Sequence, residues 1–196
     1  MSVLETLKRR GFLPAQDPAA QFPSDSPLSM LDVLGRDLPS LLEDRGFREF
    51  AQQLKIPSWP REWSPETHRA LLQLYYVRLG FLASGYVNQT SEGRATLLPH
   101  NIAAPLVQAC KLLDRPPILS YDGYCLYNWR RFNPAEAIKL GNVDTIQNFV
   151  HLYDEHWFIL VHVEIEAIGA EICSSIAEAE AALDQRDDES LTRLLK

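Results

Sequence analysis

The 196-residue chain is poor in cysteine, in basic clusters and in long apolar runs. Its three cysteines are odd in number and show no CxxC spacing, so a reduced, cytoplasmic setting is the simplest interpretation. A transmembrane helix needs about 18 consecutive apolar residues, and because no such run exists, no membrane span is expected. Acidic and basic residues appear early at the N-terminus, which is not typical of a signal peptide.

The charge pattern and the missing motifs argue against several classes of function. The formal net charge is -7, and the densest basic groups are Lys8-Arg9-Arg10 and Arg130-Arg131. Nucleic-acid binding is therefore not expected, because phosphate neutralisation needs a concentrated basic face. The sequence contains no GxGxxG, P-loop or GxSxG motif, and its five histidines lack the spacing of a zinc site. A metal site built only from this chain is not predicted.

Hydrophobic periodicity predicts an all-α fold, since no β alternation persists anywhere. Four prolines make residues 12–28 an extended arm, and Pro57 and Pro60 break the chain again. Pro39 is expected in the first turn of a new helix, Ser64 is expected to begin a helix, and Asn101 to cap one. Helices are expected at residues 1–10, 64–88, 102–113, 145–182 and 187–196, together with a helix that starts at Pro39 and continues over 45–54. A helical turn or two is expected at residues 29–35, and a helix or helical turn at 119–129.

Residues 98–129, LPHNIAAPLVQACKLLDRPPILSYDGYCLYNW, are the most informative part of the chain. An apolar helix is followed by a Pro-Pro break and then by a concentration of aromatic side chains. Buried Tyr and Trp need partners for their polar tips, so such a wall suits an aromatic ligand better than an ordinary core. Tyr121 and Cys125 are spaced to share a helix face. No basic residue neighbours Cys125, so a small wall residue is favoured over a nucleophile.

The predicted helix 145–182 carries three polar side chains within an apolar stretch. A lone His162 is more often a satisfied core residue; the alternative is a side chain that faces a ligand cavity and binds or transfers a proton there. Glu164 and Glu166 need partners if they are buried. Arg130 or Arg131 would provide a structural ion pair.

The motifs in this region resemble the indoleamine 2,3-dioxygenase family. The family pattern is LP-x-NIA-x-P, then PPIL-x-Y and a closing NW, which stand here at residues 98–105, 116–121 and 128–129. A second match, residues 157–167 (WFILVHVEIEA), is similar to the first long helix of the family's large domain. The resemblance implies a small helical domain over residues 1–144 and the start of a large haem domain over residues 145–196.

The resemblance also implies an activity and residue roles. The family uses haem b and O2 to oxidise L-tryptophan, or a related indoleamine, to N-formylkynurenine in the kynurenine pathway. By resemblance, Phe158 packs against the substrate ring and His162, where mammalian members carry a serine, accepts the indole N–H as the catalytic residue. The other residues implied in substrate binding are Tyr121, Tyr124, Cys125 and Ile159.

One departure from the family limits these expectations. The family's proximal haem histidine lies in a C-terminal half that follows the last residue of this sequence, and haem iron needs an axial ligand. The last predicted helix stops after about two turns, which is typical of a chain cut short. A truncated chain, a split enzyme completed by a C-terminal half or second polypeptide, and a pseudo-enzyme all remain open. The alternative function is a non-catalytic helical binding module.

Overall fold

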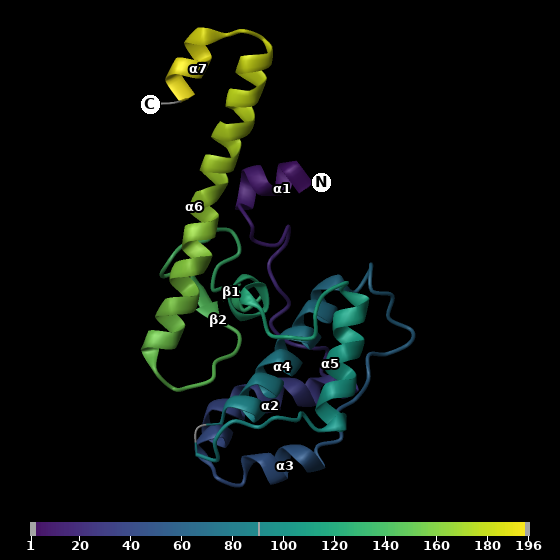
Figure 1. Ribbon diagram of the computed structural model, residues 1–196. Helices are drawn as coiled ribbons and strands as arrows, with labels where there is room; N and C mark the ends of the chain where they lie inside the picture. Colours follow the sequence, from purple (N-terminus) through teal and green to yellow (C-terminus); the bar gives the residue numbers. More distant parts are fainter. Residues whose placement is uncertain (1–2, 90, 195–196) are drawn as a thin grey trace.

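The computed structural model describes residues 3–89 and 91–194, and it confirms the helical fold class (Figure 1). Seven α-helices and two short helical turns account for most of the described chain. The α-helices are α1 (Val3–Arg10), α2 (Met30–Glu43), α3 (Phe47–Gln53), α4 (Arg69–Asn88), α5 (His100–Leu112), α6 (Tyr153–Asp184) and α7 (Asp188–Leu194). The turns are η1 (Pro27–Ser29), a 3-10 helix, and η2 (Asp122–Leu126), a π-helix. No described helix combines the length and apolar character needed to cross a membrane.

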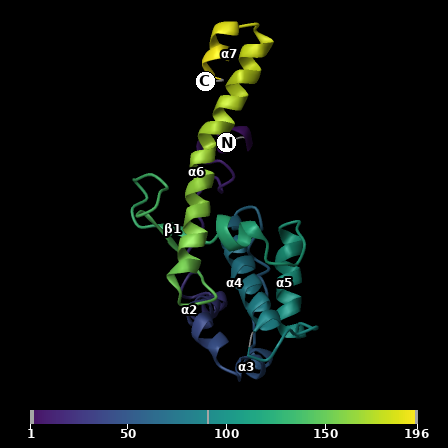
Figure 2. The same ribbon diagram turned by 60° about the vertical axis from the view of Figure 1, so that its left-hand side comes forward.

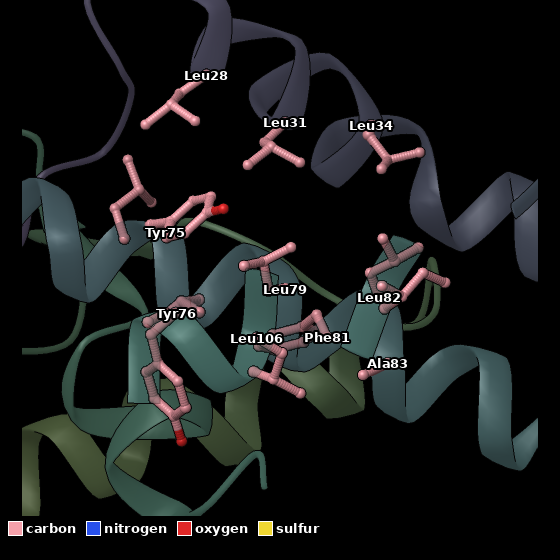
Figure 3. Close-up of a cluster of buried hydrophobic side chains, with 14 of the residues drawn as sticks. Leu28, Leu31, Leu34, Tyr75, Tyr76, Leu79, Phe81, Leu82, Ala83 and Leu106 are labelled. Atoms are coloured by element: carbon pink, nitrogen blue, oxygen red, sulfur yellow. The ribbon is translucent and has the colours of Figure 1, made fainter. Parts of the chain in front are cut away.

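The main hydrophobic core surrounds α4, which is apolar on nearly every side (Figure 3). Helices α2 and α5 pack against it, and Tyr75, Tyr76, Leu79 and Phe81 are completely buried. The tyrosine hydroxyls are satisfied, since Tyr75 donates to the carbonyl of Pro57 at 2.7 Å and Tyr76 to that of Ile118 at 2.8 Å. Burial of these phenols among apolar groups makes α4 the central element of the small helical bundle.

Three predicted helix starts were wrong. Helix α4 begins at Arg69 because Ser64 instead caps a preceding turn, accepting from the backbone N–H of Glu66 at 3.3 Å. Helix α2 continues through Pro39, which is buried, and the partly buried Leu41 and Leu42 that follow it still pack against the core. Asn101 lies inside α5 and donates from its side chain to the carbonyls of Ala51 and Leu54, both at 2.9 Å. Ser64 is used in a local turn, Pro39 is buried inside a continuous helix, and Asn101 makes long-range hydrogen bonds, so packing and tertiary contacts overrode two of the three local rules.

Arg78 connects four segments from inside the core, a role that sequence patterns did not indicate. Its side chain is 5% exposed and pairs with Asp32 of α2 at 3.0 Å. It also donates to the side-chain oxygen of Gln147 at 2.8 Å and to the carbonyl of Ala20 at 3.2 Å. A buried guanidinium requires several acceptors, and these hold the arm, α2 and the segment before α6 against α4.

A small antiparallel sheet is the one departure from a purely helical chain within the described residues. Strands β1 (Trp129–Arg131) and β2 (Val143–Thr145) pair with Arg130 opposite Asp144, whose side chains form an ion pair of 2.8 Å. Three-residue strands are too short to show alternation, so periodicity could not detect them. The predicted start of the long helix at residue 145 was therefore wrong, because residues 143–145 form β2 and α6 begins at Tyr153.

Helix α6 has 32 residues and extends beyond the bundle formed by α2–α5 (Figures 1 and 2). Its inward residues Ile159 and Val163 join Leu13, Cys125 and Trp129 in a second hydrophobic core. Helix α1 packs along it. At their junction Gly11 has a φ of 58°, and a Cβ there would lie 2.0 Å from the carbonyl oxygen of Glu166, so only glycine fits.

Candidate functional site

The π-helix η2 brings the aromatic segment against α6. Its wider turn is visible in the hydrogen bond from the N–H of Tyr127 to the carbonyl of Asp122 at 2.7 Å, five residues earlier. Gly123 permits the close approach of η2 to α4, because a Cβ there would lie 2.5 Å from a ring carbon of Tyr76. π-Helical turns of this kind occur frequently at functional sites. Side chains from η2 thereby lie next to those of α6.

Four of the predicted site residues form one group, which we call the aromatic cluster: Tyr121, Tyr124, Phe158 and His162. The ring centroids of Phe158 and His162 are 4.3 Å apart, and Tyr121 meets His162 edge-on at 5.7 Å. Tyr124 lies 6.1 Å from Phe158. Phe158 is half exposed and Tyr121 is 45% exposed, so the cluster forms an open aromatic surface. Such offset and edge-on arrangements are those that aromatic rings favour.

The other two predicted site residues, Cys125 and Ile159, lie beneath the cluster. Both side chains are completely buried, in the second hydrophobic core. Burial raises the pKa of the Cys125 thiol to about 12, so the thiol stays protonated at neutral pH. An inaccessible, protonated thiol has no nucleophilic character, which agrees with the interpretation of Cys125 as an apolar packing residue.

His162 has a defined donor and acceptor arrangement. Its Nδ1 lies 2.6 Å from the carbonyl oxygen of Phe158, one helical turn earlier. A carbonyl can only accept, so Nδ1 carries the hydrogen, and in the neutral imidazole Nε2 is left as an acceptor. The side chain is partly exposed. The cluster therefore combines flat aromatic surfaces with one imidazole acceptor.

Two glutamates hold the tyrosines of the cluster. Tyr121 donates to Oε1 of Glu166 at 3.3 Å; burial first, and then the negative charge of Glu166, raise the pKa of Tyr121 to about 12. Tyr124 donates to Oε1 of Glu155 at 3.1 Å, and burial together with Glu155 raises its pKa. Glu155 was missed in the sequence analysis. Its position in the first turn of a helix was the available signal.

The ion pairs predicted for Glu164 or Glu166 with Arg130 or Arg131 were wrong. Arg130 pairs with Asp144 across the sheet. Arg131 pairs with Asp17 of the N-terminal arm at 2.7 Å. Both arginines belong to β1, a strand that was not predicted, and their partners are Asp144 and Asp17. Glu166 instead accepts a hydrogen bond from Tyr121.

Three of the four other histidines make contacts outside the aromatic cluster. His68 stacks on Trp63 at 5.1 Å, His151 bonds the hydroxyl of Ser40 at 2.9 Å, and His156 bonds that of Thr145 at 2.9 Å. Within residues 3–89 and 91–194, no three His, Cys, Asp or Glu side chains gather as they would around a metal ion.

A cleft of about 390 Å³ lies between α2, the end of α4 and residues 149–150, and none of the predicted site residues lines it. It is connected to the cluster through Phe149, which lines the cleft and stacks on Tyr124 with centroids 6.0 Å apart. The amide of Phe149 also donates to Glu155 at 2.9 Å. Phe149 therefore lies between the cleft and the cluster and contacts both.

Comparison with known proteins assigns the family. A profile described as indoleamine 2,3-dioxygenase matches residues 4–196, nearly the whole sequence. The chain belongs to the indoleamine 2,3-dioxygenase family. The first of the two sequence blocks that suggested this family contributes Tyr121 and Tyr124 of the aromatic cluster, and the second contributes Phe158 and His162.

Curated relatives within the indoleamine 2,3-dioxygenase family cover a wide range of organisms. Indoleamine 2,3-dioxygenase 1 of Rattus norvegicus is 29% identical over 164 residues, which are 83% of this chain and 39% of the relative. Indoleamine 2,3-dioxygenase 2 of Homo sapiens is 34% identical over 125 residues, 63% of this chain and 31% of the relative. The Saccharomyces cerevisiae enzyme is 31% identical over 166 residues, with coverages of 82% and 36%. The chain thus spans well under half the length of these relatives.

Proposed function

We propose that this chain provides the substrate-facing wall of a haem-dependent dioxygenase that opens the indole ring of L-tryptophan, or a related indoleamine, with O2 to form N-formylkynurenine. Family membership supports the reaction class. The observation that carries the assignment to the aromatic cluster is the free Nε2 acceptor of His162 beside the rings of Phe158 and Tyr121. An indole has a single N–H donor on an otherwise apolar, flat ring.

In this proposal each residue has a separate task. Phe158 and Tyr121 offer faces and edges against which the indole ring packs. Nε2 of His162 accepts the indole N–H and so fixes the orientation of the ring; it is also the group that would take up a proton there. Tyr124 forms the inner wall, held by Glu155, while Cys125 and Ile159 support the cluster from below and keep water out.

The residues of this chain fit haem b on one of its two sides only. Its aromatic and apolar cluster suits the substrate side of the group, and haem when bound would supply the O2 activation. By the family resemblance, the axial ligand of the iron comes from the C-terminal part of the family's proteins, and this chain covers 31–39% of the three relatives described above. The proposal therefore includes a C-terminal half or second polypeptide that contributes this ligand, and the complete site is expected in the cytoplasm.

Reconstitution tests the proposal. The chain is mixed with haem, a reductant, L-tryptophan and the part of the yeast relative that lies C-terminal to the matched region. N-Formylkynurenine absorbance is then measured, with the intact yeast relative as positive control. The expected result is a haem Soret band and product. A Soret band with tryptophan binding but no product would instead favour the non-catalytic binding module, for which the missing axial ligand is the supporting observation.

The role of His162 can be separated from a structural one. His162→Ala should lower kcat/KM for L-tryptophan by about tenfold, the loss expected for one hydrogen bond. The same variant should change little with 1-methyl-L-tryptophan, which has no indole N–H to donate. His100→Ala, an exposed histidine at the start of α5, is the matched control. Equal losses with both substrates would contradict an orienting hydrogen bond.

A further inference from the structure

Helix α6 is apolar on two opposite sides, but only one of them is buried by the described residues. The inward side contains Ile159, Val163 and Ala170, all at most 4% exposed. The opposite side, which we call the outer face, carries large apolar side chains at intervals of three, four, seven or eight residues, which keep them on one side of the helix. It consists of Trp157, Ile165, Ile168, Ile172, Ile176 and Leu183, exposed by 55–64%.

This amount of exposed apolar surface is unusual on one helix. Four isoleucines within twelve residues leave their side chains mostly in solvent, although a helix that is apolar on both sides is normally buried on both. The C-terminal part of α6 extends away from the bundle in both views (Figures 1 and 2), and α1 and α7 are the described helices that pack on it there. The outer face therefore has the character of an interface.

The charges beside the outer face indicate what kind of partner could bind to it. Helix α6 contains eight acidic residues and no lysine or arginine. Glu164, Glu171, Glu178 and Glu180 have no ion-pair partner among the described residues, and the last three are exposed. A second copy of this chain would bring two acidic helices together, and like charges facing each other oppose that pairing.

We infer that the outer face of α6 binds a helix with an apolar stripe flanked by lysine and arginine, supplied by the polypeptide that completes the dioxygenase site. The inference rests on the proposed function for the identity of that polypeptide, while the charge and apolar pattern alone define its chemistry. Trp157 is the first residue of the outer face, and its neighbour Phe158 belongs to the aromatic cluster. The outer face and the aromatic cluster therefore both begin in the first turns of α6.

Two synthetic helical peptides with the same leucine seam test the charge preference: one carries lysine and the other glutamate at the flanking positions. Trp157 fluorescence is the readout, because Trp157 is 62% exposed, whereas Trp59 and Trp129 are buried and Trp63 is partly buried between Trp59 and His68. The lysine peptide should shift the emission to the blue and bind at least tenfold more tightly than the glutamate peptide. This preference should shrink at high salt. Equal binding of both peptides, or no binding of the lysine peptide, overturns the inference.

Substitutions locate the binding surface. Ile168→Ser together with Ile172→Ser should weaken binding of the lysine peptide at least tenfold, whereas Val33→Ser, an equally exposed aliphatic position on α2, should not. Circular dichroism checks that each variant keeps its helix content. Sedimentation of the unmodified chain without peptide tests whether a second copy of the chain covers the outer face. A stable homodimer that the lysine peptide cannot displace contradicts the inference. No haem or tryptophan is present, so these outcomes do not depend on turnover.

Discussion

The phenol of Tyr124 donates to a carboxylate oxygen of Glu155 across 3.1 Å, and this contact links the aromatic cluster to the start of α6. The same carboxylate accepts from the backbone N–H groups of Phe149 and Val150, each at 2.9 Å. Glu155 is 8% exposed, and its buried carboxylate accepts hydrogen bonds from these three donors. One buried charge thus orders the chain before α6 and orients a ring of the candidate site.

Glu155→Gln should destabilise the fold by about 1–3 kcal/mol, because an amide cannot accept from all of these donors and leaves buried groups unsatisfied. Urea denaturation gives the free energy of unfolding. Glu171→Gln, an exposed acid on the same helix, is the matched control and should change it by less than about 0.5 kcal/mol. Equal effects of both changes would contradict the structural role of Glu155.

Gly123→Ala should destabilise the fold by about 1–3 kcal/mol, since the new methyl group overlaps the ring of Tyr76. Gly169→Ala offers the opposite case in the same experiment. That glycine lies inside α6 with open space around it, so alanine should stabilise the helix by about 0.5–1 kcal/mol. Thermal unfolding of the two variants should therefore move the Tm in opposite directions, and a shift in the same direction would refute this account.

The three free thiols should react with a maleimide at very different rates. Burial raises the pKa of both Cys110 and Cys125, and both side chains are at most 1% exposed, whereas Cys173 is partly exposed. Mass spectrometry under native conditions should find Cys173 modified first, and all three modified only in denaturant. Rapid labelling of Cys125 in the folded chain would show that the second core opens.

Asp17 should make stability depend on pH. Burial alone would raise the pKa of Asp17, but hydrogen bonds from Arg131 and Arg10 outweigh it and hold the pKa below its ordinary value of 3.8. A lowered pKa stabilises the folded state above that ordinary value, and the contribution disappears as the pH falls through the folded-state pKa. Asp17→Asn should therefore be less stable than the parent near about pH 7, with the difference shrinking towards about pH 3. A difference that does not vary with pH would contradict this assignment.

Local chemistry determined the helical class, the order of most helices and the two blocks that resemble the indoleamine 2,3-dioxygenase family. These features depend on the local sequence alone, as in α6, where apolar side chains recur without a proline for about nine turns. The resemblance to this family selected Tyr121, Tyr124, Phe158 and His162, which the fold brings together from two separate segments.

Tertiary structure alone decided which partners the polar groups found. Glu155 became a site residue because Phe149 and Tyr124 converge on it, and Arg131 paired with Asp17, 114 residues away. Pro39 remained inside a helix and Asn101 bonded another segment, because packing and long-range hydrogen bonds outweighed local preference. Such contacts join residues far apart in sequence, so no local pattern encodes them.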